Sequence, residues 1–126
     1  MKETRTIRIA WPQGAVTATL ADTPTARALL AALPIHGKAQ TWGEEVYFEI
    51  PVTATLEPGA MQVVDPGTVC FWTEGHALAL PWGRTPVSQG SESRLVTRCN
   101  VLGMIAGDPR VLAGVRSGDA IAISRE

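Results

Sequence analysis

The sequence predicts a mainly β fold, a closed antiparallel eight-stranded barrel with one helix and one short helix, in a single domain spanning residues 1–126. Apolar and polar residues alternate over several short segments, turn residues separate these segments, and only two segments carry helix signals. Closure is expected because a barrel leaves no strand edge exposed. No repeat or linker divides the 126 residues, a length that suits one core.

Residues 5–11 and 16–20 are predicted to form the first hairpin. Ile7, Ile9 and Trp11 fall on one face of the first segment, with polar or small residues on the other. A Pro-Gln-Gly turn follows, and the alternation then resumes in the second segment. We therefore expect two half-buried strands whose register is set by their apolar faces.

The next segment has helical spacing. Thr23 can cap a helix, Pro24 suits its first turn, and apolar residues recur at spacings of three and four as far as Leu33. These features predict a helix over Pro24–Leu33. Residues 35–41 show no periodicity, so we interpret them as a loop.

The clearest strand is predicted at residues 46–52. Its apolar residues alternate with Glu45, Tyr47 and Glu49, which would project from the opposite face. That spacing suits a binding site and also suits a solvated strand face. We favour the solvated face, because charged residues usually cover exposed faces of sheets.

The stretch 67–86 organises the rest of the chain. Residues 61–64 and a tight Asp-Pro-Gly turn lead into it, and it contains two short apolar strands, 69–72 and 78–82, joined by Thr-Glu-Gly-His. Large rings, a histidine, a glutamate and an arginine gather here more densely than elsewhere. The stretch could line a groove, although packing is the commoner role of such aromatic residues.

The last third of the chain returns to strand signals. A polar, glycine-containing loop is expected within residues 87–98, followed by a strand at 100–105. Asp108-Pro109 predicts the start of the short helix, with a cap and then a first-turn proline. Residues 120–124 are expected to form the last strand.

Composition excludes several classes of function. The formal net charge is −1 and the basic residues are scattered, so we expect no nucleic-acid partner. No apolar run reaches the roughly 20 residues of a membrane-spanning helix, and the first residues lack the apolar segment of a secretion signal, so we expect no membrane association and a cytoplasmic location. Cys70, Cys99, His36 and His76 have no metal-ligand spacing. We therefore predict buried structural cysteines, no metal site and no cofactor.

Three patches, residues 42–52, 75–86 and 100–109, together resemble one family. They read WGEEVYFEIPV, GHALALPWGRTP and NVLGMIAGDP. In order and spacing they are similar to small uncharacterised prokaryotic proteins with a cyclophilin-like fold, over most of the chain from Ile7 onward. The resemblance implies an eight-stranded barrel with helices at its ends, and no settled activity.

Cyclophilins themselves are peptidyl-prolyl isomerases, and the family resemblance locates where their catalytic residues would stand. The strand that would carry the catalytic arginine offers Glu44, Glu45, Tyr47 and Glu49 here. An acidic face cannot supply the cation that assists loss of amide resonance. Arg84 could substitute only if its loop returned over the groove.

We therefore predict a binding module rather than an isomerase, and leave open whether the protein is an enzyme. The expected ligand is a small molecule or an extended peptide, held by aromatic stacking and a few polar contacts. The candidate pocket residues are Trp42, Tyr47, Glu49, Trp72, His76, Trp82 and Arg84. The alternatives are a weak prolyl isomerase and a hydrolase that uses Glu45 or Glu49 with His76. A homodimer through an exposed apolar strand face is also possible.

Overall fold

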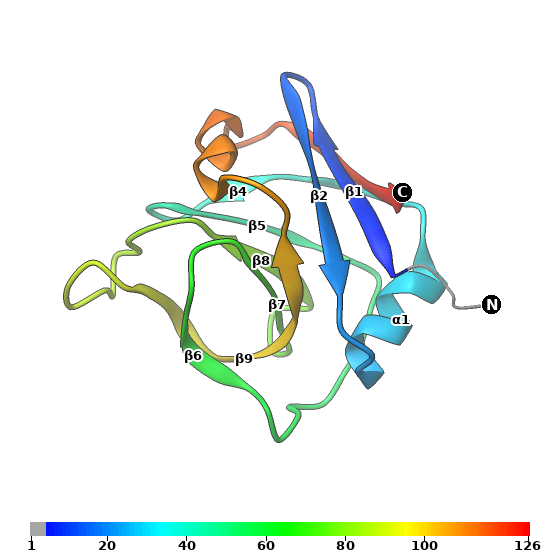
Figure 1. Cartoon of the computed structure of the whole chain (residues 1–126), viewed down its shortest axis with the longest axis horizontal. Helices are drawn as coiled ribbons and strands as arrows, with labels where there is room; N and C mark the ends of the chain where they lie inside the picture. Colours follow the sequence, from blue (N-terminus) through cyan, green and yellow to red (C-terminus); the bar gives the residue numbers. More distant parts are fainter. Residues whose placement is uncertain (1–4) are drawn as a thin grey trace.

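A computed structural model of the chain describes residues 5–126 (Figure 1). Residues 1–4, which belong to the start that we expect to lack a secretion signal, lie outside the described residues. The strands are β1 (Thr6–Trp11), β2 (Gly14–Leu20), β3 (Ile35–Lys38), β4 (Gln40–Thr41), β5 (Glu45–Glu49), β6 (Met61–Val64), β7 (Thr68–Trp72), β8 (Ala77–Pro81), β9 (Ser93–Ile105) and β10 (Ala120–Arg125). The helices are α1 (Pro24–Ala32) and a 3-10 helix, η1 (Pro109–Gly114).

All of the strand pairs are antiparallel, and they follow the order β3-β10-β1-β2-β9-β7-β8-β5-β4, with β6 paired to β9. The order has two ends, β3 and β4, which Ala39 alone separates in the chain. Ala39 still exchanges backbone hydrogen bonds with Gly118 and Asp119 before the chain turns to pair with β5. The mainly β, antiparallel architecture with two helices is confirmed. Within residues 5–126, hydrogen bonds do not close the sheet and ten strands are present, so the closed eight-stranded barrel is not confirmed.

The N-terminal predictions are confirmed. β1 and β2 form the hairpin, with Ile9 opposite Val16, and the apolar faces of both strands are buried. The Thr23 hydroxyl accepts a hydrogen bond from the backbone N–H of Ala26, which caps α1 as expected. Asp108 caps η1 in the same way. Figure 1 shows η1, in orange, and α1, in cyan, toward opposite ends of β1 and β2.

The loop predicted at residues 35–41 is wrong. Residues 35–38 pair with β10, where Ile35 lies opposite Ile123, and residues 40–41 pair with β5. Gly37 interrupts the apolar pattern for a steric reason, since a side chain there would come within 3.3 Å of both Phe48 and the Glu49 carbonyl. The pairing is therefore set by distant strands rather than by local alternation.

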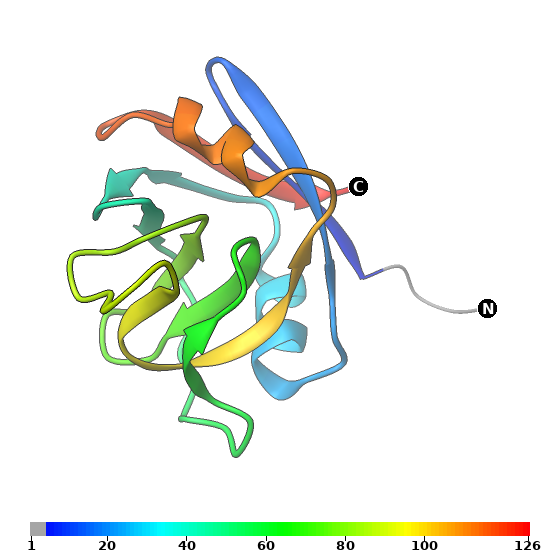
Figure 2. The same cartoon turned by 60° about the vertical axis from the view of Figure 1, so that its left-hand side comes forward.

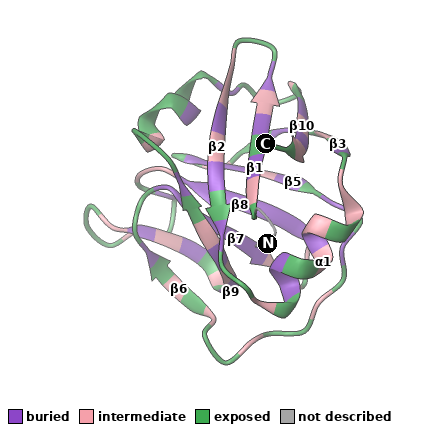
Figure 3. Ribbon diagram, turned by 45° about the vertical axis from the view of Figure 1, so that its right-hand side comes forward, coloured by how far each residue is buried: buried purple, intermediate pink, exposed green. Residues whose placement is uncertain are grey.

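Two apolar clusters lie on opposite faces of the strands β5, β8 and β7. Val46, Phe48, Phe71, Leu78 and Leu80 belong to the main core, together with residues of β1, β2 and α1. Cys70 of β7 and Ala79 of β8 belong to a smaller cluster on the outer face, against which Tyr47 of β5 packs. Val64, Leu95 and Cys99, from β6 and β9, complete this cluster. Figure 3 shows β7 and β8 coloured almost throughout as buried. Both faces of these central strands are thus covered.

The cover on the outer face comes from β6 and the first half of β9. β9 is longer than the predicted 100–105 strand and begins at Ser93, so it takes up part of the expected polar loop. Figure 2 shows this strand bending strongly along its length, with β6 beside its first half. Its pairing with β7 shifts register between Val69 and Cys70, a β-bulge that increases bending and twist. In the described residues, no helix is long and apolar enough to cross a membrane.

Candidate functional site

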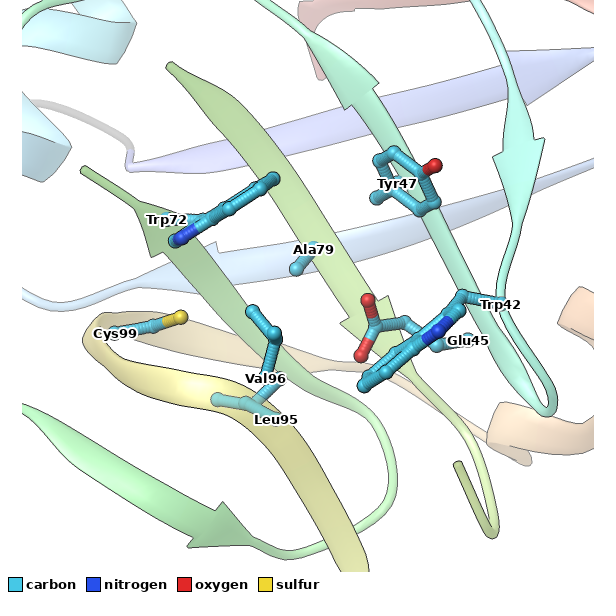
Figure 4. A pocket seen from close by; sticks show the side chains of 8 residues that line it. All are labelled: Trp42, Glu45, Tyr47, Trp72, Ala79, Leu95, Val96 and Cys99. Atoms are coloured by element: carbon cyan, nitrogen blue, oxygen red, sulfur yellow. The ribbon is translucent and has the colours of Figure 1, made fainter. Parts of the chain in front are cut away.

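A small cavity of about 160 Å³ lies on this outer face (Figure 4). Its walls are three aromatic rings, and its remaining lining is mostly aliphatic. The lining residues are Trp42, Glu45, Tyr47, Trp72, Ala79, Leu95, Val96 and Cys99. They come from the β4–β5 turn, β5, β7, β8 and the first half of β9, so the cavity exists only because β9 folds back over the sheet.

Strand register explains why the cavity is open beside Ala79. Ala79 lies opposite Tyr47 of β5 on one side and opposite Cys70 of β7 on the other. Side chains of directly paired residues point to the same face of a sheet. A methyl group in the middle of this row leaves a hollow between the larger side chains of the two outer strands.

The β4–β5 turn fixes Trp42 at the rim. Gly43 adopts φ +59°, a left-handed conformation that glycine tolerates without strain, and the Trp42 N–H donates to the Glu45 carbonyl at 3.0 Å. The Glu44 carbonyl accepts from the backbone N–H groups of Trp82 and Gly83. The turn is therefore anchored to the segment that follows β8, and Trp42 is held by backbone contacts.

Glu45 is the buried acid of the cavity. Only 6% of the residue is exposed, and the carboxylate oxygen Oε1 is buried with no hydrogen-bond partner among residues 5–126. Removal from water disfavours the ionised form, which raises the pKa of Glu45 from 4.5 to about 7. A carboxyl group of this kind can change its charge near neutral pH, so it can act as an acid, a base or a counter-ion.

The predicted solvated face of β5 is therefore wrong at Glu45, although Glu49 is exposed as expected. Leu95, Val96 and Cys99 lie over the start of the strand and share the cavity with Glu45. Alternation along β5 assigns all of its acidic residues to one face, but it carries no information about a distant segment that covers half of that face.

Trp72 carries the second buried polar atom without a partner, the indole Nε1. Figure 4 shows Trp72 across the hollow from Trp42, with the Glu45 carboxylate directed into the space between them. The two cysteines are buried and free, as predicted. Burial raises the pKa of Cys99 to about 12 and that of Cys70 well above its usual value, so both thiols are neutral near pH 7.

A wider cavity of about 520 Å³ adjoins the small one. Tyr47 and Trp72 line both, so their rings separate a small apolar hollow from a larger polar one. The other lining residues of the wider cavity are His36, Gly37, Lys38, Gln40, Glu49, Gly75 and Ala77. A bound molecule could therefore place a small group in the inner cavity and a polar remainder in the outer one.

The structure brings together four of the seven predicted pocket residues, Trp42, Tyr47, Glu49 and Trp72. His76 is exposed at the β7–β8 turn with φ +50°, and its carbonyl accepts from the Ile50 N–H. Trp82 packs partly buried against the main core, and the exposed Arg84 guanidinium donates to the Ser88 carbonyl. None of these three lines either cavity.

The lining of the two cavities can be compared with the hydrolase, isomerase and metal-site hypotheses. His76 is absent from the lining of both cavities, so the acid–histidine pair of the hydrolase hypothesis does not face one hollow. Among residues 5–126, neither cavity has an arginine in its lining that could assist isomerisation of a proline bond. The same range contains no group of three or more His, Cys, Asp and Glu side chains placed to hold a metal ion.

The sequence hypotheses include Glu45 only as a catalytic acid of the alternative hydrolase and not as a residue of the candidate pocket. Glu45 directly follows Trp42, Gly43 and Glu44, and a glutamate two residues before the only tyrosine of the chain shares that tyrosine's strand face. The missing signal is the cover supplied by residues 95–99. Without it, the residue looks like an ordinary surface acid.

The chain is similar to known proteins over nearly its full length. A family model described as cyclophilin-like matches residues 5–124. Among solved structures, the hypothetical protein AF2241 from Archaeoglobus fulgidus aligns with a TM-score of 0.83 and 32% identity, covering 98% of this chain and 95% of that one. McbB, solved in complex with tryptophan, aligns with a TM-score of 0.69 and 17% identity, covering 95% of this chain and 44% of McbB, a similarity of fold. No protein of curated function matches.

Proposed function

This chain belongs to the cyclophilin-like family, and we propose that it binds a small molecule in the cavity of Trp42, Glu45, Tyr47 and Trp72. One observation carries the proposal. Glu45 and Trp72 line this cavity, and within residues 5–126 Glu45 Oε1 and Trp72 Nε1 are buried without hydrogen-bond partners, with the Glu45 carboxylate directed into the hollow (Figure 4). A buried polar group without a partner costs about 1–3 kcal/mol, and most native proteins avoid that cost. A ligand that gives Glu45 a hydrogen-bond donor or an opposite charge offsets this cost.

The shape of the site favours a small molecule over an extended peptide. The inner cavity is smaller than the roughly 300–1,000 Å³ of pockets for drug-sized ligands, and its polar groups are side-chain atoms rather than a row of backbone groups. The wider cavity beyond Tyr47 and Trp72 offers room for the rest of the molecule. Peptide binding by strand addition would instead use backbone donors and acceptors at a sheet edge.

A ligand screen tests the proposal. Melting temperature and intrinsic tryptophan fluorescence are recorded with a panel of metabolites and short peptides. A true ligand raises the melting temperature and changes the emission of Trp42 and Trp72. Tryptophan belongs in the panel as one probe, because McbB was solved with it. If no compound changes either signal, the binding function is wrong.

Matched variants show where the signal comes from. Trp11 and Trp82 pack with the main core and line neither cavity. Trp11→Phe and Trp82→Phe should therefore keep the ligand-induced change, whereas Trp42→Phe and Trp72→Phe should reduce it. The opposite pattern would place the ligand elsewhere.

Acid–base catalysis is a second candidate function, favoured by the pKa of Glu45 near 7. A general acid or base works best when its pKa lies near the working pH, and a buried carboxyl group is a common way to reach that value. Under this alternative, Glu45→Gln abolishes turnover of a ligand found in the screen while binding is kept. Unchanged ligand after long incubation with the wild-type protein would exclude it.

A further inference from the structure

We propose that the inner cavity recognises a methylated ammonium group, which the rings of Trp42, Tyr47 and Trp72 surround while Glu45 supplies the opposite charge. The inference rests on the proposed small-molecule function and names its ligand class. It depends on three features of the described residues: the arrangement of the rings, the unpaired acid and the aliphatic remainder of the lining.

Three aromatic side chains from different elements meet at one hollow. Trp42 belongs to the β4–β5 turn, Tyr47 to β5 and Trp72 to β7, and Figure 4 shows the rings on different sides of the space. The face of an aromatic ring is electron-rich and attracts a cation, with tryptophan the strongest of the three types. Cages of such rings are the usual means by which proteins bind quaternary ammonium groups.

The charge of the site also favours a cation. Glu45 is in no ion pair, and neither cavity has an arginine in its lining within residues 5–126, while the one lysine, Lys38, lines only the outer cavity. A buried carboxylate without an opposite charge is costly, and the protein relieves this cost by raising the pKa of the group. A ligand cation between the rings would stabilise the ionised form instead.

The cavity lining has few hydrogen-bond acceptors, and this favours a methylated ammonium group over a primary amine. A primary ammonium group carries three N–H donors, each of which needs an acceptor when it is taken out of water. Besides Glu45 and the Tyr47 hydroxyl, the lining offers only a thiol, indole rings and the aliphatic side chains of Ala79, Leu95 and Val96. A quaternary ammonium needs no acceptor, and its methyl groups can contact the aliphatic side chains.

The size of the cavity limits what enters it. About 160 Å³ suits a compact headgroup, and a longer substituent would pass Tyr47 and Trp72 into the outer cavity. There it would meet His36, Lys38 and Glu49, which can pair with polar or charged ends. The same headgroup chemistry occurs in free choline-like compounds and in methylated lysine side chains.

Choline and its uncharged isostere, 3,3-dimethylbutan-1-ol, test the inference directly. Each is titrated into the full chain at pH 8 with tryptophan fluorescence and calorimetry as readouts. Choline should bind, and the neutral isostere should bind roughly tenfold more weakly, because it lacks the attraction to the rings and to the carboxylate. A trimethyllysine peptide and its unmodified form, titrated in parallel, identify the source: tighter binding of the methylated peptide than of choline indicates a side chain, and the reverse indicates a free compound.

Variants separate the role of charge from the role of shape. Glu45→Gln keeps the size of the side chain and should weaken choline binding roughly tenfold, while the affinity for the neutral isostere stays within about twofold of the wild-type value. Glu126→Gln, which changes an exposed acid that lines neither cavity, is the matched control and should leave the choline affinity within about twofold. Trp42→Leu changes a half-buried residue of the turn and should also weaken choline binding. It provides the test if Glu45→Gln does not fold.

Equal affinities for choline and the isostere, or an unchanged choline affinity in Glu45→Gln, would overturn the cation inference and leave the small-molecule function standing. Absence of choline and peptide binding would overturn it as well. The broad ligand screen decides the proposed function by itself, because it includes neutral and anionic compounds.

Discussion

Glu45 of β5 and Trp72 of β7 line one cavity, and each has a buried polar atom with no hydrogen-bond partner in the part of the chain that the structure describes. The strand between them, β8, contributes only the methyl group of Ala79 to that cavity. The Glu45 carboxylate thus lies with an unsatisfied acceptor at an apolar hollow (Figure 4). Native proteins pair most buried polar atoms, so this arrangement supports the proposed ligand site.

Replacement of Glu45 by glutamine should change how stability depends on pH. In the unfolded chain the carboxyl group loses its proton near pH 4.5, whereas in the folded protein it keeps the proton until about pH 7. The folded state therefore holds more protons in this window, and wild-type stability falls as pH rises through it and levels off above pH 7. A shift of this size corresponds to at most about 3.4 kcal/mol.

Urea denaturation at pH 5, 6, 7 and 8 measures this effect. Glu45→Gln cannot lose a proton, so its stability should exceed that of the wild type increasingly from pH 5 to pH 7. The other titratable groups of the cavity are the Tyr47 hydroxyl and the Cys99 thiol, with Cys70 beneath, and both thiols stay protonated over this range. Parallel stability curves for the two proteins would show that Glu45 titrates normally.

Ala79→Val should fill the floor of the inner cavity. The added methyl groups enter existing space beside Tyr47 and Cys70, so we expect the free energy of unfolding to change by less than about 1.5 kcal/mol. Choline binding, measured by fluorescence titration, should be lost. Ala77→Val, on the same strand but lining only the outer cavity, is the control and should retain choline binding. Wild-type affinity in Ala79→Val would mean that the ligand does not enter this hollow.

Local patterns predicted much of the fold and part of the site. Alternation predicted the β1–β2 hairpin and β5, and capping residues predicted α1, because these depend on neighbouring residues. The same alternation assigned Tyr47 and Glu49 to one strand face, and both line the outer cavity. These features need no knowledge of the rest of the chain.

The missed features depend on segments far apart in the sequence. β3 pairs with the last strand of the chain, and Gly37 interrupts its pattern so that Phe48 can approach. Glu45 becomes buried only because the bent first half of β9 covers the outer face. Neither the bend of a strand nor the face that it covers can be inferred from the alternation of either segment.

Asn100→Ala should destabilise the fold strongly. The Asn100 side chain is fully buried, and it donates to the Thr25 hydroxyl and the Thr55 carbonyl, each at 2.9 Å, and accepts from the Glu57 N–H at 2.7 Å. It therefore ties β9 to the start of α1 and to the segment before β6. Each hydrogen bond contributes about 1 kcal/mol, and the partners lose theirs too, so we expect a loss of roughly 2–4 kcal/mol.

Chemical denaturation measures the loss, and Thr25→Val offers a comparison. That variant removes one hydroxyl from the same network and leaves the contacts of Asn100 with Thr55 and Glu57 in place. It should cost less than Asn100→Ala. An Asn100→Ala protein as stable as the wild type would show that the network does not hold these segments together.

Gly103→Ala tests the close approach of β9 to β2. A Cβ atom at Gly103 would collide with the Thr19 carbonyl and would lie 2.8 Å from the Leu20 Cα, both backbone atoms that cannot move without disrupting the strand pairing. Overpacking of a well-packed site typically costs about 1–3 kcal/mol, and backbone displacement places this variant at the upper end. Gly59→Ala is the matched control, because no described atom outside residues 58–60 lies within 4 Å of its added Cβ, and its free energy of unfolding should stay within about 0.5 kcal/mol of the wild type. The first half of β9 covers the inner cavity, so Gly103→Ala should also weaken choline binding, whereas Gly59→Ala should not. Equal melting temperatures for the two variants would mean that the two strands can separate at Gly103 without cost.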